Sequence, residues 1–351
     1  MKIMHLLCSS HFSGAENVVC QIIDLFSGDD RIEMIYCSPN GPIEDYLKRN
    51  GIAFYGLKKM SMREVKRAID FIKPDLIHAH DMRASFYATR ASKKVPVISH
   101  IHNNALDSRR LSLKSITYAF CSKKISHIFW VSNEAMEGYK FSNLLSKKSS
   151  VLQNIINCEK IYNLVDEDQK SYSFDLVYVG RITKIKNPHR LISICSRLVA
   201  EKEDIRIAIV GSGDMYNEIH DSATELNLLG NIEFFGFVRN PYKIIMSSKC
   251  MIMTSIYEGL PMVALEGMCL GVPLVSTPVD GLKSVIINGY NGYLSDSDDE
   301  IVKNILNILD DNALFNYLHK NQLELSQKMN NIDVYYKNIL DVYVKTVGEK
   351  I

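Results

Sequence analysis

The sequence predicts an α/β protein of two domains, each a parallel β-sheet with helices on both faces. Its 351 residues exceed the length of a usual single domain. From residue 3 to residue 131, short apolar runs alternate with stretches that have helical spacing. After a polar stretch at 165–171, a dense apolar run at 174–179 begins the same alternation again. Such alternation is typical of parallel sheets, because each strand needs a crossover to reach the next.

The first domain is predicted from apolar runs of strand length and from helical periodicity between them. In the first helix, for example, Val18, Ile22 and Phe26 recur on one side. The predicted strands are 3–8, 33–37, 52–55, 76–79, 97–101 and 128–131, and the predicted helices are 15–26, 43–50, 62–72, 84–92 and 112–123.

The second domain repeats the pattern and ends in a helical tail. Its predicted strands are 174–179, 206–210, 232–235, 251–254 and 273–276. A helix is predicted at 189–200 and another after Pro261, which is tolerated in a first helical turn. The chain from 299 is helical in pattern, and 334–347 is amphipathic.

Composition excludes several classes of protein. No apolar run approaches the ~20 residues that a membrane span needs, and the N-terminus fits a strand and glycine loop better than a signal peptide. The eight cysteines are scattered without a C-x-x-C pair, so we expect reduced thiols in a cytosolic protein. The nearest metal-ligand candidate, His78 with His80, has no third ligand nearby in the sequence, so we expect no metal site.

Charge is unevenly spread although the net charge is only +1. Between Arg83 and Lys148 there are twelve basic and three acidic residues, which leaves +9. This segment is either a solvated face that balances acidic surface elsewhere or a surface attracted to an anionic membrane or a phosphorylated acceptor. Nucleic acid is not expected as a partner, because the pI is near neutral and no binding motif is present.

Two carboxylates, Glu258 and Glu266, have seven residues between them, of which the first three are Gly259-Leu260-Pro261. The first is predicted in a loop at the carboxyl end of a strand, where ligands of α/β sheets bind. The second is predicted in the following helix among apolar residues, where an ionised group needs a partner. A lone Glu is usually a solvated surface residue, but this setting favours a binding role.

Other strand ends of the second domain carry cations and glycines. Arg181 and Lys186 follow the strand at 174–179, where such a pair suits a diphosphate, although they also suit a solvated loop. Gly211 begins a Gly-Ser-Gly turn that lacks the third glycine of a dinucleotide-binding loop, so NAD binding is disfavoured. Phe237 and Val238 follow the strand at 232–235 and read equally well as a ligand contact or as strand-end packing.

In the first domain, Gly14 stands at the start of the first helix, where the lack of a side chain lets the backbone approach a ligand closely. His78 reads as a packed side chain, whereas His102 stands at a strand end and suggests function. Three further residues stand at strand ends of this domain and are candidates for contact with a ligand: His80, Asn103 and Ser132.

These motifs resemble glycosyltransferase family 4, the retaining GT-B enzymes. Four motifs occur in the family's order between 174 and 294: G-R-x4-K-N, V-G-x-G, F-x-G-x-V and E-G-x-P-x4-E. The sequence departs from the family at Ser13 and Ile155, where glycine is usual. The resemblance implies a catalytic set of Glu258, His102, Arg181 and Lys186. It implies a donor-binding set of Gly14, Arg181, Lys186, Gly211, Phe237, Val238, Glu258, Gly259, Leu260 and Glu266.

The family's architecture is two Rossmann-like domains that face a cleft, with the last helix crossing back to the first domain. By this resemblance, residues 1–160 bind the acceptor, 161–333 bind the nucleotide-sugar, and 334–351 form the returning helix. No metal or cofactor is implied.

The implied function is retaining transfer of a sugar from a nucleotide-sugar to a lipid-linked saccharide in bacterial capsule, exopolysaccharide or O-antigen assembly. A UDP-sugar is the first expectation for the donor and GDP-mannose the second. The resemblance also implies a cytoplasmic enzyme, peripheral on the inner face of the cell membrane. The alternative is a non-catalytic nucleotide-sugar-binding subunit, which the residues at Ser13 and Ile155 favour weakly.

Overall fold

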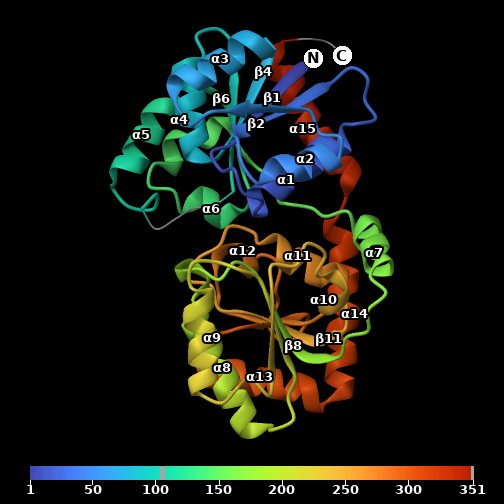
Figure 1. Ribbon diagram of the computed structural model, residues 1–351. Helices are drawn as coiled ribbons and strands as arrows, with labels where there is room; N and C mark the ends of the chain where they lie inside the picture. Colours follow the sequence, from blue (N-terminus) through green and yellow to red (C-terminus); the bar gives the residue numbers. More distant parts are fainter. Residues whose placement is uncertain (103–106, 349–351) are drawn as a thin grey trace. The chain divides into compact units, whose positions relative to one another are not determined.

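The structure, a computed structural model, describes residues 1–102 and 107–348. The chain forms two compact units (Figure 1). Unit 1 comprises Met1–Asn154 together with the chain from Ile332 onward, and unit 2 comprises Ile155–Asn331. The boundaries drawn from the sequence, after 160 and 333, fall slightly later.

Unit 1 is a parallel sheet in the strand order β3-β2-β1-β4-β5-β6-β7. Its strands are β1 (Lys2–Leu6), β2 (Glu33–Pro39), β3 (Phe54–Leu57), β4 (Leu76–His80), β5 (Val97–Ile101), β6 (Ile125–Trp130) and β7 (Ser149–Val151). Its helices are α1 (Gly14–Leu25), α2 (Ile43–Arg49), α3 (Met62–Ile72), α4 (Asp81–Ala91), α5 (Leu113–Ser122), α6 (Asn133–Glu137) and α15 (Ile332–Val347), with the 3-10 turns η1 (Ser142–Leu144) and η2 (Ser146–Lys148).

Unit 2 has the corresponding order β10-β9-β8-β11-β12-β13, also parallel. Its strands are β8 (Phe174–Val179), β9 (Ile207–Val210), β10 (Ile232–Gly236), β11 (Ser248–Met253), β12 (Leu274–Ser276) and β13 (Gly292–Leu294). Its helices are α7 (Cys158–Glu167), α8 (Pro188–Glu201), α9 (Tyr216–Glu225), α10 (Tyr242–Met246), α11 (Met262–Cys269), α12 (Asp280–Lys283), α13 (Asp298–Asp310) and α14 (Asn312–Met329), with the 3-10 turn η3 (Lys184–Lys186).

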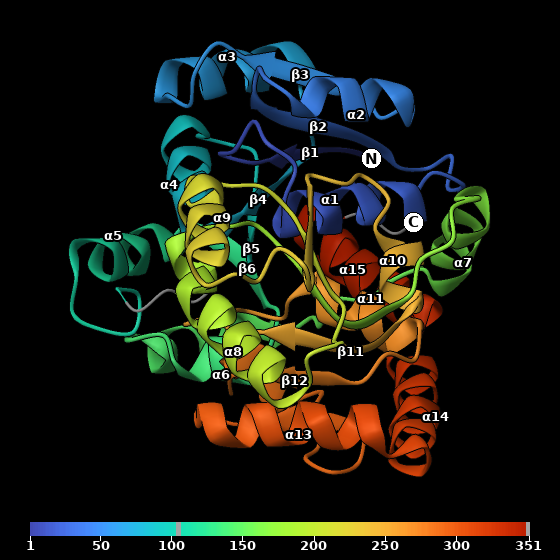
Figure 2. The same ribbon diagram turned by 60° about the horizontal axis from the view of Figure 1, so that its bottom comes forward.

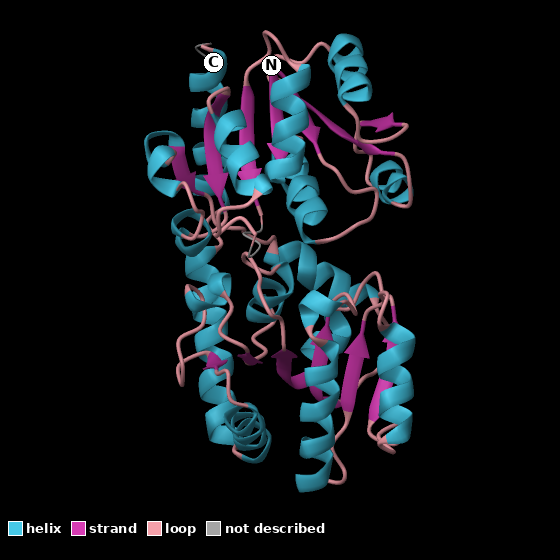
Figure 3. Cartoon of the chain, turned by 90° about the vertical axis from the view of Figure 1, so that its left-hand side faces the viewer, coloured by secondary structure: helices cyan, strands magenta, loops and turns pink. Residues whose placement is uncertain are grey.

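The predicted α/β class with two parallel sheets is therefore confirmed. Each sheet is flanked by helices, as Figure 3 shows for strands and helices in separate colours. The two faces of the unit 1 sheet differ in chemistry. One face packs Met4, Leu6 and Ala79 against buried residues of α3 and α4. The other carries histidines beneath α15, whose Tyr343 hydroxyl lies 2.7 Å from Nδ1 of His78.

The core of unit 2 lies between its sheet and helices α8, α9 and α13. Ile207 and Ile209 of β9, Leu191 of α8 and Ile305 of α13 are fully buried there. Figure 2 shows α13 running along β12, with α14 crosswise near one end of α13. This packing holds the strands of unit 2 rigidly, so the loops at their carboxyl ends have fixed starting points. Among the described residues, no helix is both long and apolar enough to cross a membrane.

Candidate active site

Both sheets reverse their strand order beside the first strand of the unit. In unit 1, β1 lies between β2 and β4, and in unit 2, β8 lies between β9 and β11. Ligands of open α/β sheets bind at the carboxyl ends of strands beside such a reversal. In unit 2 the segments at that point are 180–186, after β8, and 254–261, after β11.

Lys186 and Glu258 meet at this point from the two neighbouring segments. The Nζ atom of Lys186 forms an ion pair with Oε1 of Glu258, and Oγ of Ser255 donates to the same oxygen at 2.9 Å. Thr254 fixes the backbone below, because its Oγ1 donates to the Lys186 carbonyl at 2.9 Å. Both charged side chains are only 14 % exposed, so they lie where charges interact more strongly than in water.

Arg181 stands at the start of the same segment and is exposed. Its guanidinium has no hydrogen-bond or ion-pair partner among the residues that the structure describes. Nearby, Gly211 has a φ of 146°, and a Cβ there would lie 1.8 Å from the carbonyl oxygen of Gly180. Glycine is therefore required where the loops after β8 and β9 touch. The arrangement leaves one free guanidinium beside one paired ammonium, which suits an anionic ligand.

Glu266 lies on α11 and is 8 % exposed. Burial raises the pKa of this carboxyl to about 7, and the Tyr242 hydroxyl, 3.4 Å from Oε1, opposes the rise. The carboxylate therefore loses its charge close to neutral pH. A buried acceptor of this kind suits a ligand that donates hydrogen bonds, such as a sugar hydroxyl.

The segment before α11 presents buried backbone. Gly259 and Leu260 are buried, and a Cβ on Gly281 would lie 1.5 Å from the Gly259 carbonyl oxygen, so α12 packs directly against this loop. The helix begins at Met262, and Pro261 occupies the N-cap with extended backbone rather than the first turn as predicted. The free N–H groups of the first turn favour negative charge at this end of α11.

Phe237 and Val238 follow Gly236, which has a φ of 64°. Phe237 is 68 % exposed, whereas Val238 is half-buried. Strand-end packing, the competing interpretation, therefore does not describe Phe237, because a packed side chain would not be this exposed. A large exposed aromatic ring beside β10 is available for stacking.

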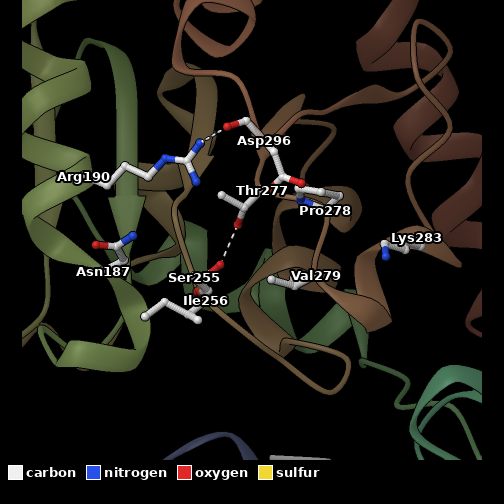
Figure 4. A pocket seen from close by; sticks show the side chains of 9 residues that line it. All are labelled: Asn187, Arg190, Ser255, Ile256, Thr277, Pro278, Val279, Lys283 and Asp296. Carbon is white, nitrogen blue, oxygen red and sulfur yellow. Dashed lines mark hydrogen bonds between the residues drawn. The ribbon is translucent and has the colours of Figure 1, made fainter. Parts of the chain in front are cut away.

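A hollow of about 410 Å³ lies within unit 2 (Figure 4). Its lining residues come from the ends of several strands and the start of α8: Asn187, Arg190, Ser255, Ile256, Thr277, Pro278, Val279, Lys283 and Asp296. Ser255 belongs to this lining and also contacts Glu258. Thr277 donates to the Ser255 carbonyl at 2.7 Å, and Arg190 is bound to Asp298 at 2.7 Å. Apart from Asn187, which ends the G-R-x4-K-N motif, these residues belong to no motif, so the sequence did not indicate them.

Unit 1 carries five buried histidines on one face of its sheet: His5, His78, His80, His100 and His102. Alternate residues of a strand point to the same face, which unites His78 with His80 and His100 with His102. The strand register sets His5 opposite His78 and His80 opposite His100. Three of the five, His78, His80 and His102, were candidates from the sequence, whereas His5 and His100 were not.

Three of these rings form a hydrogen-bonded row. Nδ1 of His5 lies 3.0 Å from Nε2 of His80, and Nδ1 of His80 lies 2.9 Å from Nε2 of His102. Burial lowers the pKa of His5 and of His102 to about 3 and holds that of His80 well below its usual value. The imidazoles are therefore neutral at physiological pH.

His102 is also held through its backbone. Its N–H donates to Oδ1 of Asp81 at 3.0 Å, and Asp81 adopts a φ of 70° at the start of α4. A non-glycine residue in that region costs about 1–3 kcal/mol, and such strain gathers at functional sites. Asp81 is thus a residue of the candidate site that no motif indicated.

Two groups of three imidazoles have ligand atoms within 4.8 Å of one another: His5 with His78 and His80, and His80 with His100 and His102. The third ligand was invisible in the sequence because it comes from a neighbouring strand. Imidazole suits Zn²⁺, but a metal-bound histidine normally donates its other N–H to a partner. His80 already uses both nitrogens on His5 and His102, so the rings fit a hydrogen-bonded row better. The absence of a metal stays a prediction.

The remaining candidates of unit 1 have simpler settings. Gly14 begins α1 in open space. Ser132 is buried, and its Oγ caps α6 by accepting from the Ala135 N–H at 3.1 Å, which gives it a structural role. Asn103 lies outside the described residues.

Comparisons with known proteins agree with this geometry. A family model described as Glycosyltransferase Family 4 matches residues 12–160, and one described as Glycosyl transferases group 1 matches 165–338. The UDP-Gal:alpha-D-GlcNAc-diphosphoundecaprenol alpha-1,3-galactosyltransferase of Escherichia coli is 24% identical, with 100% of this chain and 98% of that protein covered. The lipopolysaccharide 1,6-galactosyltransferase of Salmonella typhimurium is also 24% identical, over 81% of this chain and 82% of that protein.

Among solved structures, Anabaena HepE in complex with UDP-glucose has a TM-score of 0.86 at 18% identity, covering 98% of this chain and 100% of that one. This likeness concerns the fold. The two family models between them take in nearly the whole chain, and the four motifs of unit 2 stand at its strand ends in the family's order. The chain belongs to glycosyltransferase family 4, with the GT-B fold, and is a glycosyltransferase.

Proposed function

We propose that the protein transfers a hexose with retention of configuration from a nucleotide-sugar to a lipid-linked saccharide in the assembly of a bacterial surface polysaccharide. The observation that carries the donor half is the convergence of Lys186, Glu258 and unpaired Arg181 at the strand reversal of unit 2. UDP is the expected nucleotide, with GDP-mannose as the second donor to test. The relatives support this choice, since one is named for UDP-Gal and one neighbour was solved with UDP-glucose.

The chemistry places negative charge on the departing diphosphate. Arg181, Lys186 and the N-terminus of α11 offer positive charge and N–H donors to it, and donors that are fixed in place before reaction stabilise such charge best. Glu258, held by Lys186 and Ser255, accepts hydrogen bonds from the sugar. Glu266 accepts from the ribose, and Phe237 with Val238 borders the base.

His102 is assigned to the sugar as a neutral hydrogen-bonding group, and attack occurs on the face from which the diphosphate leaves. We assign no covalent nucleophile and no metal. The acceptor side is assigned to unit 1, with His80, Asn103 and Ser132 as its first candidates.

The acceptor assignment rests on the relatives' names, which include a diphosphoundecaprenol substrate and a lipopolysaccharide. An acceptor of this kind is held at a membrane, so an anionic membrane surface is part of the proposal, at the cytoplasmic face. Unit 1 supplies a matching surface. Leu113 and Phe120, on one side of α5, are 83 % and 64 % exposed, and Lys114 and Lys123 flank them.

The α5 surface, defined as residues 107–124, carries five basic residues against one acidic residue, a net charge of +4. Apolar side chains among cations are the pattern of helices that lie in a membrane interface. The test is co-sedimentation with phosphatidylglycerol and phosphatidylcholine vesicles. We expect salt-sensitive binding to the anionic vesicles only, lost in Leu113→Ser/Phe120→Ser and kept in Phe71→Ser, whose ring on α3 is 74 % exposed. Equal binding by the double variant would remove this part of the proposal.

The test of the donor site is a melting-temperature series with UDP, GDP, ADP, dTDP and NAD, followed by transfer assays with the matching sugars and a lipid-linked acceptor. A ligand at about 100 times its Kd adds about 2.7 kcal/mol to the folded state. We expect a shift with UDP, and transfer that Arg181→Ala abolishes and Lys184→Ala keeps, since Lys184 is an exposed cation of the same turn. A shift with NAD alone would overturn the proposal, and UDP binding without transfer to any acceptor would favour the non-catalytic subunit.

A further inference from the structure

Two thiols from distant parts of the sequence meet between α7 and α11 of unit 2. Cys158 is the first residue of α7 and Cys269 the last of α11. One turn beyond Cys158, the hydroxyl of Tyr162 donates to the Cys269 carbonyl at 2.8 Å, and residues four apart on a helix share a face. The side chains of Cys158 and Cys269 lie in hydrogen-bond contact with each other.

The sulfur of Cys158 also meets two groups at the end of α14. It lies 3.6 Å from Oγ of Ser326 and 3.5 Å from Nδ2 of Asn330. Asn330 is held in turn by Ile156, whose N–H donates to its Oδ1 at 3.0 Å. Donors converging on one sulfur stabilise a thiolate, and the bond from Cys269 is the main cause that lowers the pKa of Cys158 to about 7.

Three other thiols have the opposite setting. Burial raises the pKa of Cys37 and of Cys195 to about 12, and Cys8, which is half-buried like Cys158, is raised to about 12 by the same cause. For Cys269, its bond to Cys158 and its burial both raise the pKa. The pair thus joins one half-buried cysteine of thiolate character to one buried thiol, the arrangement of an attacking and a resolving cysteine.

We propose that Cys158 and Cys269 form an oxidation site for peroxides that closes to a disulfide between α7 and α11. The Cys158 thiolate attacks one peroxide oxygen, the O–O bond breaks, and the leaving oxygen departs as hydroxide, which takes up a proton to become water. Cys158 is then a sulfenic acid. The Cys269 sulfur, giving up its proton, attacks the Cys158 sulfur and expels the hydroxyl as a second water. Two thiols and one peroxide become one disulfide and two waters.

The cysteine pair and the proposed donor site share helix α11. Glu266 stands three residues before Cys269 on α11, and its charge acts on the Cys269 thiol. A disulfide draws two sulfurs closer than a thiol–thiol hydrogen bond does, so the end of α11 moves toward α7. We expect oxidation to weaken UDP binding, and this consequence alone rests on the proposed function.

The experiment uses the full chain, reduced, desalted and treated with hydrogen peroxide. Peptide mass spectrometry without reductant should find one cross-linked pair containing Cys158 and Cys269, lighter by two hydrogens and separated again by dithiothreitol. Cys158→Ser should abolish the cross-link, and Cys269→Ser should leave a Cys158 sulfenic acid that a 1,3-diketone traps. Cys8→Ser, the matched half-buried control, should cross-link like the native protein.

The proposal is wrong if Cys158 reacts with iodoacetamide no faster than Cys8 and peroxide produces no Cys158–Cys269 cross-link. UDP affinity is measured before and after oxidation of the same sample. If the reduced protein binds no UDP, the proposed donor site is contradicted. The proposal that Cys158 and Cys269 form a disulfide is not affected by that result. A cross-link that leaves UDP affinity unchanged would remove only the link to Glu266.

Discussion

The two sheets share a strand order, yet their carboxyl ends have opposite chemistry. The loops of unit 2 bring together Arg181, Lys186, Glu258 and Glu266, which are charged or close to titration at neutral pH. The corresponding part of unit 1 holds buried, neutral imidazoles joined in a row. The fold therefore fixes where side chains converge, and the residue types decide whether that place suits a charged diphosphate or an uncharged hydroxyl.

The largest effect is expected from removing a cation of unit 2. Lys186→Met deletes the ammonium assigned to the diphosphate and leaves Glu258 without its ion-pair partner, so we expect kcat to fall by about 10²–10³, as for loss of one preorganised donor. Lys184→Met removes an equal charge from the same turn and should change kcat little. Steady-state transfer assays on both variants, with circular dichroism to confirm folding, make the measurement. Equal losses of kcat in the two variants would mean that the site needs only positive charge in this turn and that Lys186 has no specific role.

The next largest effect is the loss of stability of unit 1 as the pH falls. The folded pKa values of His5 and His102 lie at about 3, below the ~6.5 of an unfolded histidine. The unfolded chain therefore binds more protons, and stability is complete above pH 6.5 and lost as pH falls toward 3. Each such histidine lowers the free energy of unfolding by up to about 1.4 kcal/mol per pH unit in that window.

Urea unfolding between pH 8 and 5, followed by signals from unit 1, measures this slope. His100→Phe should reduce it, because burial holds the pKa of His100 below its usual value as well. A slope that survives His100→Phe intact would mean that this ring is protonated in the folded protein.

A smaller effect is expected at Glu266. If the ribose donates to this carboxylate, UDP affinity should fall as pH drops through about 7, where burial places the pKa of Glu266. Glu266→Gln should weaken UDP binding about tenfold, the loss of one hydrogen bond to a charged group, and should remove the pH dependence. Calorimetric titrations at pH 6, 7.5 and 9 test both statements. An unchanged pH dependence in the variant would assign the titration to another group.

The smallest effect is expected from chelation. Because cations of the chain itself are assigned to the diphosphate, EDTA should leave both UDP binding and the transfer rate unchanged. Elemental analysis of the untreated protein accompanies the assay, since the two histidine groups of unit 1 have ligand atoms close enough for a metal. A chelator-sensitive rate would contradict the metal-independent proposal, and a bound metal with an unchanged rate would place it outside the chemistry.

The sequence was sufficient where the information is local. Alternating periodicities predicted both parallel sheets. Lys186 and Glu258 were each predicted at a strand end, and the structure brings them together there. The sequence was insufficient where register between strands matters: His5 joins the row, and His100 packs against His80 and His102, only because β1, β4 and β5 are neighbours. The meeting of Cys158 with Cys269 was likewise invisible, because helix packing brings these residues together.

The return of the last helix has a consequence for biosynthesis. Tyr343 is fully buried against His78, and Tyr336 donates to Asp29 at 2.5 Å, so α15 completes the core of unit 1. Unit 2 is contiguous, and the ribosome has made all of it before α15 emerges. Domains generally fold as units during synthesis. Unit 1 is translated first, but the face of its sheet that α15 covers stays exposed while unit 2 is made and folds. Chaperones would therefore meet the histidine face of the nascent chain, uncovered, until α15 has been made.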